Sequence, residues 1–233
     1  MKNHISLFIF AIALLSGPVS ANDLSMTAVK DTLASIPGEH NYIYVRTPLG
    51  EDEEKNYDEI TFYDGLGREL DFAQSYGADR AGAIMAHHHL IEYDSLGRKE
   101  KQWLSTNTSF SYMSPEDLKG GVLWDYHDAG KRSYLQTNYE SSPLNRITEQ
   151  YGVGDAWGDH PARMEYLTNI PADSLRCSFY FIDDNDSLIR RGDYRSGELQ
   201  VTKATDEDGK PTYTFVDKQG RTLLTRLGRG NQQ

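Results

Sequence analysis

Three consecutive histidines, His87, His88 and His89, are the most conspicuous side chains with metal-binding chemistry. Zinc sites use neutral imidazoles that converge from one face, and on a strand only His87 and His89 would share a face. Glu92 or a distant histidine would have to complete such a site, and the sequence contains neither an HExxH motif nor a facing Cys/His pair. We therefore predict no metal site, and we expect the histidines to lie on an exposed or edge strand.

Residues 183–187 (DDNDS) resemble the opening of a calcium-binding loop. An EF-hand loop needs glycine at position 6 and glutamate at position 12, but a loop that starts at Asp183 has Leu188 and Tyr194 there. The pattern fails as a calcium site, and a polar hairpin turn between two apolar segments explains it better.

No residue pattern in the sequence indicates catalysis. Carboxylates are numerous, but the sequence does not place two of them at the separation that glycoside hydrolysis needs. A Gly-x-Ser-x-Gly motif is missing, and the glycine-rich segment 152–158 lacks the Lys-Ser/Thr pair of a phosphate-binding loop. We predict a protein that is not an enzyme, with no catalytic residue and no cofactor. Its aromatic residues, including Trp103, Trp124 and Trp157, leave carbohydrate binding by ring stacking open as an alternative.

The elements that position these side chains are expected to be strands. The chain has 15 Tyr, recurrent turn residues and little helical periodicity, which together favour a mainly β fold of antiparallel hairpins. One short helix is expected near 115–126. Ser114 can cap it, Pro115 suits its first position, and Glu116 and Asp117 interact favourably with its N-terminal dipole.

One turn motif, Asp-x-x-Gly-Arg, recurs along the chain, and segment 206–210 (DEDGK) is a weaker copy of it. The Asp side chain can accept hydrogen bonds from the backbone N–H groups that follow, and Gly can adopt the left-handed conformation that closes a bulged hairpin. The three better copies consist of Tyr63, Asp64, Gly67 and Arg68; Tyr93, Asp94, Gly97 and Arg98; and Asp217, Gly220 and Arg221.

The first of these hairpins has alternating apolar residues on both sides of its turn. Ile60 and Phe62 precede the turn, and Leu70 and Phe72 follow it. Because successive side chains of a strand point to opposite faces, we expect these four to share one face of the sheet.

The first 21 residues have the layout of a secretory signal peptide. Lys2 precedes a short uncharged apolar run, and Val19-Ser20-Ala21 offers small residues for cleavage. The run is too short for a membrane span, which takes about 20 apolar residues. We therefore predict export to the periplasm, the cell surface or the medium, with no membrane span after cleavage.

The mature chain is expected to comprise a flexible lead-in (22–40), one β-rich domain (41–226) and a tail (227–233). A net charge of −11 disfavours nucleic acid as a partner, because phosphate backbones are repelled by an acidic surface. Cys177, the only cysteine, lies in an apolar strand-like run and is expected to be a buried thiol.

Six segments, in order, resemble the N-terminal domain of Bacteroidetes-type RHS/YD-repeat proteins. They are 60–68 (ITFYDGLGR), 92–104 (EYDSLGRKEKQWL), 139–152 (YESSPLNRITEQYG), 165–169 (EYLTN), 199–209 (LQVTKATDEDG) and 217–226 (DKQGRTLLTR). The resemblance implies a signal peptide, this domain, and then a long array of YD repeats that often ends in a variable domain. In related shells the repeats form a hairpin strip that encloses a toxin.

The sequence departs from that plan because no repeat array follows Arg226. The resemblance therefore predicts a truncated or split structural module, with the downstream YD-repeat portion or another RHS-type chain as its partner. The two other hypotheses are a stand-alone adhesion module that binds a glycan, and a metal-dependent hydrolase.

Overall fold

The computed structural model describes residues 30–31, 33–34, 36–38, 40–48, 56–78 and 84–228. The segment predicted as a signal peptide, most of the predicted lead-in and residues 229–233 of the predicted tail lie outside these ranges. The chain divides into two compact units, with the boundary after Leu135.

The described elements are mainly strands, as the sequence predicts, and the described strand pairs are antiparallel. The first unit contains β1 (Asn41–Pro48), β2 (Asn56–Tyr63), β3 (Glu69–Ala78), β4 (Ile84–Tyr93), β5 (Lys99–Trp103), β6 (Thr106–Ser109), helix α2 (Pro115–Asp125) and the 3-10 helix η1 (His127–Ala129). Strand β7 (Tyr134–Tyr139) continues into the second unit. That unit contains β8 (Ile147–Tyr151), η2 (Asp155–Trp157), β9 (Ala162–Thr168), η3 (Asp173–Leu175), β10 (Ser178–Ile182), β11 (Leu188–Asp193), β12 (Gln200–Thr205), β13 (Pro211–Val216) and β14 (Thr222–Leu227).

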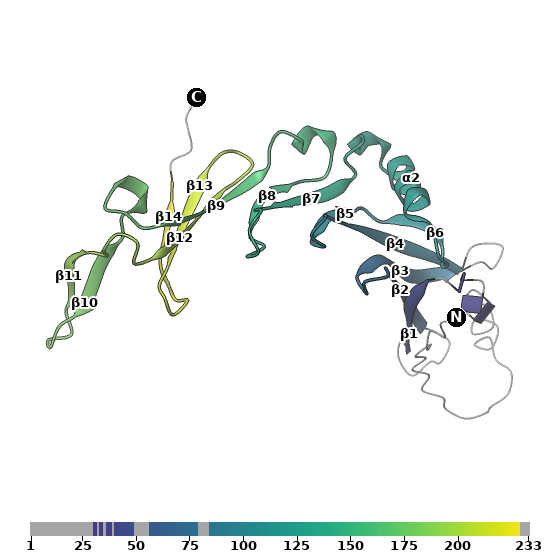
Figure 1. Cartoon of the computed structure of the whole chain (residues 1–233), viewed down its shortest axis with the longest axis horizontal. Helices are drawn as coiled ribbons and strands as arrows, with labels where there is room; N and C mark the ends of the chain where they lie inside the picture. The colour runs from purple at the N-terminus through teal and green to yellow at the C-terminus, as the bar shows by residue number, and fades with distance from the viewer. Residues whose placement is uncertain are drawn as a thin grey trace. The chain divides into compact units, whose positions relative to one another are not determined.

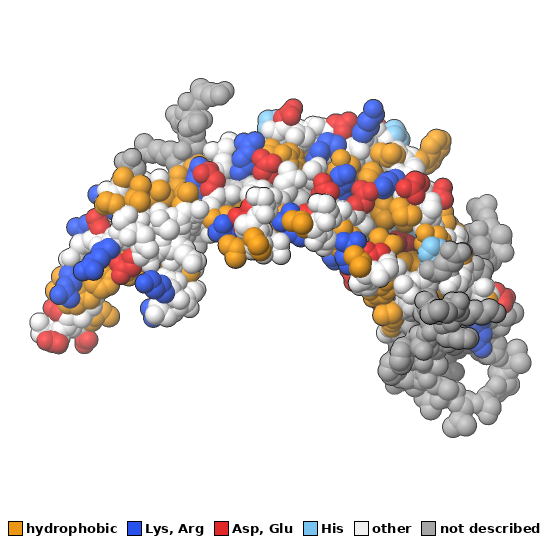
Figure 2. Space-filling model, in the orientation of Figure 1, with side chains coloured by type: hydrophobic (Ala, Val, Ile, Leu, Met, Phe, Trp, Pro, Cys, Tyr) orange, Lys and Arg blue, Asp and Glu red, His pale blue; other side chains and the backbone are white. Residues whose placement is uncertain are grey.

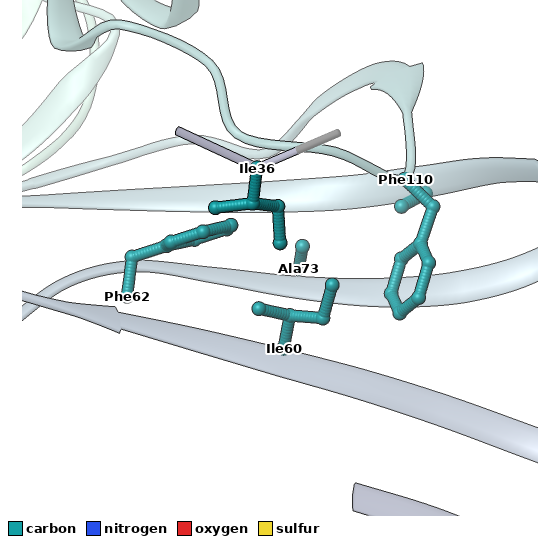
Figure 3. Close-up of a cluster of buried hydrophobic side chains, with 6 residues drawn as sticks. Ile36, Ile60, Phe62, Ala73 and Phe110 are labelled. Atoms are coloured by element: carbon teal, nitrogen blue, oxygen red, sulfur yellow. The ribbon is translucent and has the colours of Figure 1, made fainter. Parts of the chain in front are cut away.

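In the first unit the strands follow one another in chain order from β1 to β5, and β6 pairs with the first half of β4 (Figure 1). One face of this sheet carries the core. Ile60, Phe62 and Ala73 are at most 1% exposed there, and Ile36 and Phe110 pack over them. Figure 3 shows these side chains pointing toward one another between the strands and the covering segments.

The prediction that Leu70 and Phe72 share a face of the sheet with Ile60 and Phe62 is wrong. Phe62 pairs with Asp71 and Ile60 with Ala73, so Asp71 and Ala73 share the core face, while Phe72 pairs with Thr61 on the opposite face. The cause is an irregularity in the register beside the turn, between Phe62 and Tyr63. A bulge of one residue turns every later side chain of the strand to the other face.

Helix α2 starts and ends close to the predicted positions. The Ser114 hydroxyl accepts a hydrogen bond from the Asp117 N–H at 3.1 Å, which satisfies one free donor of the first turn. Leu118 and Val122 are buried. A Cβ at Gly121 would lie 2.7 Å from Thr106 Oγ1, so this glycine lets the helix approach β6 closely. This packing offsets the unfavourable helix propensity of the glycine.

In the second unit the strands follow the order β7-β8-β9-β12-β13-β14, and this unit has its own core. Cys177, Leu199, Val201 and Phe215 are at most 3% exposed. The prediction of a buried thiol is confirmed, and burial raises the pKa of Cys177. Strands β10 and β11 form a separate two-stranded hairpin that extends from this unit (Figure 1).

Candidate functional site

The Asp64 turn shows how the recurring motif closes a hairpin. Asp64 Oδ1 accepts hydrogen bonds from the N–H groups of Leu66 and Arg68 at 2.8 and 2.9 Å, and Oδ2 accepts one from Arg68 Nε at 2.7 Å. The Gly67 N–H donates to the Asp64 carbonyl at 3.0 Å. One carboxylate therefore satisfies the loop backbone and fixes the arginine at the same time.

The turns at Asp94 and Asp217 repeat this arrangement, with the same aspartate–arginine distance of 2.7 Å. Gly67, Gly97 and Gly220 have φ of 77°, 81° and 79°, in the left-handed region that glycine favours. In each turn the pKa of the aspartate is lowered, and the largest cause is the hydrogen bond that the backbone N–H of the arginine donates to the charged carboxylate.

Two further turns belong to the same type. The weaker copy at Asp206 closes on Lys210, and the turn at Asp183 closes on Ser187. Asp183 Oδ1 accepts from the N–H groups of Asn185 and Ser187 at 3.0 and 2.8 Å, and Asp186 takes the position of the glycine with φ of 58°. Asp183 of the apparent calcium loop therefore binds the backbone of a hairpin turn, as the alternative interpretation of this segment expects.

The β7–β8 hairpin has a longer version of the turn, which does not contain the Asp-x-x-Gly-Arg motif. Arg146 contacts both carboxylate oxygens of Glu140, with Nε–Oε1 at 2.8 Å and Nη2–Oε2 at 2.7 Å. The bonds from Arg146 are the largest cause that lowers the pKa of Glu140 to about 2. The available signal was the Tyr139-Glu140 pair, in which glutamate replaces the aspartate of Tyr-Asp.

The arginines of two turns also connect each hairpin to the strand that follows it. The Arg68 guanidinium carbon lies 4.4 Å from the centre of the Tyr93 ring, and the Tyr93 hydroxyl donates to the Glu69 carbonyl at 2.8 Å. A Cβ at Gly97 would lie 2.9 Å from Arg68 Nη1, so Gly97 also makes room for this arginine.

The second unit has the same pair of contacts. The Arg146 guanidinium carbon lies 4.5 Å from the centre of the Tyr166 ring, and the Tyr166 hydroxyl donates to the Ile147 carbonyl at 3.0 Å. Both tyrosines therefore stack on a turn arginine and donate to the carbonyl of the residue after it. We call this pair of contacts the Arg–Tyr staple.

Replacing Gly67 by Val is expected to lower the free energy of unfolding by about 1 kcal/mol or more, because a β-branched residue is strained at positive φ. Gly65→Val is the matched control, since Gly65 lies in the same turn, without positive φ, and both glycines have open space around Cβ. Urea unfolding of the two variants measures the difference. Equal stabilities would contradict the strain argument.

The three histidines do not converge. The expectation of an exposed or edge strand is wrong, because β4 pairs with β3 on one side and with β5 and β6 on the other. His88 is 1% exposed, and its Nδ1 lies 2.7 Å from Asp71 Oδ2. His89 lies on the opposite face, near the Phe72 ring. Within the described ranges no group of three His, Cys, Asp or Glu side chains is placed to hold a metal ion.

A shallow depression of about 290 Å³ lies on the face of the first unit's sheet opposite the core. Phe72, His89 and Trp103 line it together with Glu69 and Gln102. The Trp103 ring packs 4.8 Å from the Tyr134 ring, and its Nε1 donates to Glu92, so internal contacts fix this tryptophan.

The other two tryptophans lie elsewhere. Trp124 on helix α2 is 83% exposed, whereas Trp157 packs against Gly152 in the glycine-rich segment. Among the described residues, no helix has the length and apolar character needed to cross a membrane.

The fold and the recurring turns define a protein of antiparallel β-hairpins closed by acid–arginine turns. Residues 41–168, more than half of the chain, match the family model described as Domain of unknown function (DUF6443), and the protein belongs to this family. Neither the curated proteins nor the solved structures contain a significant match.

Proposed function

We propose that this protein is an exported, non-enzymatic structural module of the RHS/YD-repeat type, and that its sheet is extended by further hairpins of a downstream YD-repeat portion. The observation that carries the proposal is the Arg–Tyr staple, which joins one hairpin to the next strand in each unit. A repeated contact between successive hairpins is what an elongating β-structure needs, because each added hairpin buries surface only against its neighbour.

Two further features support this role. Strand β14 is the last strand in the sheet order and pairs with β13 alone among the described residues. Its unpaired backbone groups form an edge that can accept another strand. On the face visible in Figure 2, basic and acidic side chains are interspersed with hydrophobic ones, which suits contacts with protein better than with a polyanion.

Analytical ultracentrifugation of the mature chain, with and without the polypeptide encoded directly downstream, tests the proposal. We expect a complex with that polypeptide, or concentration-dependent self-association without it, since the β14 edge favours pairing. A chain that stays monomeric at all concentrations and forms no complex with the downstream polypeptide would show that the sheet is not extended.

Carbohydrate binding is the second candidate function. The observation in its favour is the depression lined by Phe72, His89 and Trp103, with Glu69 and Gln102 as polar groups. It ranks second because the Trp103 ring and Nε1 are already engaged by Tyr134 and Glu92.

A further inference from the structure

The Arg–Tyr staple follows from strand register. In the β3–β4 pair, Asp71 lies opposite Leu90, so three residues further along Arg68 falls opposite Tyr93. In the β8–β9 pair, Glu149 lies opposite Arg163, so three residues further along Arg146 falls opposite Tyr166. In both units the tyrosine thus lies opposite the turn arginine and follows a run of strand residues, nine in β4 and four in β9.

Arg221 has the first half of this arrangement. Its Nε lies 2.7 Å from Asp217 Oδ2, as in the other two Asp-x-x-Gly-Arg turns. Its side chain is 71% exposed, against 32% for Arg68 and 41% for Arg146, both of which lie beneath a tyrosine ring. Among the described residues, no ring stacks on Arg221.

We propose that Arg221 and the Thr222 carbonyl form a docking point for one tyrosine, on a strand of a downstream YD-repeat hairpin that pairs antiparallel with β14. The ring would stack on the Arg221 guanidinium, and the hydroxyl would donate to the Thr222 carbonyl. The two stapled pairs within the chain supply the geometry, and this inference rests on the proposed function.

The same geometry argues against a second copy of this chain that would pair its strand β1 with β14. A tyrosine that completes the staple must follow a run of strand residues that pairs with the strand after the turn, whereas Tyr42 and Tyr44 of β1 follow only one and three strand residues. The recognition element is therefore a tyrosine that follows a run of strand residues, as Tyr93 does in β4.

The probe for the test is this chain's own Tyr-Asp hairpin. A second copy of residues 81–103 is appended directly after Gln233, which reproduces the sequence spacing between Arg68 and Tyr93. Hydrogen exchange of the β14 amides is then compared in the full chain with and without this extension, because pairing of the edge protects them.

We expect the extension to slow exchange along β14. Arg221→Gln, or phenylalanine in place of the appended tyrosine, should reduce this added protection about tenfold, the loss expected from one cation–π contact or one buried hydrogen bond. Each variant is also measured in the unextended chain, which removes any effect on the Asp217 turn itself. Arg190→Gln, which breaks an exposed ion pair with Asp193, is the control and should leave the added protection unchanged.

Two other outcomes are distinct. Protection that persists in Arg221→Gln and in the phenylalanine extension would overturn the docking point while leaving the proposed extension of the sheet intact. An extension that gives β14 no protection in any form would overturn both, because the edge would then not accept a hairpin of this type.

Discussion

Replacing His88 by Leu is expected to lower the free energy of unfolding by about 3–5 kcal/mol, because the substitution leaves a buried carboxylate without its partner. Asp71 is 3% exposed and His88 is 1% exposed. Their side chains meet at 2.7 Å on the core face of the sheet, between β3 and β4.

The hydrogen bonds around the pair explain the size of this effect. His88 Nε2 lies 3.0 Å from the Ser109 carbonyl, which can only accept, so Nε2 must carry a hydrogen. The second contact of the imidazole is between Nδ1 and Asp71 Oδ2, while Asp71 Oδ1 has no hydrogen-bond partner among the described residues. Burial of one carboxyl oxygen without a hydrogen bond already costs stability, and loss of His88 would leave both oxygens without a partner.

A double variant separates the pair from the packing around it. Asp71→Leu combined with His88→Leu removes both polar groups, and its loss of stability should be at least 2 kcal/mol smaller than that of His88→Leu alone, about the cost of one orphaned buried charge. Urea unfolding of the single and double variants gives the comparison. A double variant as unstable as the single one would mean that the lost volume, rather than the unpaired carboxylate, causes the damage.

The mainly β character of the chain and its hairpin turns were the parts of the fold that the sequence predicted best. Both depend on short-range patterns, since two-residue alternation marks strands and the Asp and Gly of a turn act on the adjacent backbone. Helix α2 was equally local, because Ser114 and Pro115 mark its start. The side-chain facing of β3 was not predictable in this way, because one bulge beside the Asp64 turn reverses it.

The contacts between hairpins could not be derived from the motif alone. Arg68 and Tyr93 are both motif residues, but their stacking depends on the register of β3 and β4, which the sequence does not state. The run of three histidines predicts an exposed or edge strand, although the environment of His88 is set by Asp71 on another strand. Long-range pairing therefore decides which motif residues act together.

Asn169 provides the second large expected effect, and no sequence pattern singled out its role. Asn169→Ala is expected to lower the free energy of unfolding by about 3 kcal/mol, because the buried Leu199 N–H and two partly buried carbonyls lose a side-chain partner at once. Asn169 is 0% exposed and lies directly after β9.

The Asn169 side chain holds the segment between β11 and β12. Its Nδ2 donates to the carbonyls of Tyr194 and Arg195 at 3.3 and 2.8 Å, and its Oδ1 accepts from the Leu199 N–H at 2.8 Å. Leu199 is itself a core residue of the second unit. The amide group therefore fixes the end of the β10–β11 hairpin to the start of β12, next to the core.

Asn169→Asp distinguishes hydrogen bonding from volume, because the carboxylate has almost the same size. It can still accept from Leu199, but its second oxygen would face the carbonyls of Tyr194 and Arg195 with no hydrogen to donate. At neutral pH we expect this variant to be at least as unstable as Asn169→Ala. Asn185→Ala, at an exposed turn position, is the control and should change stability by less than about 0.5 kcal/mol. If Asn169→Asp unfolded at the same urea concentration as the unmodified chain, the amide donors would have no part in holding this segment.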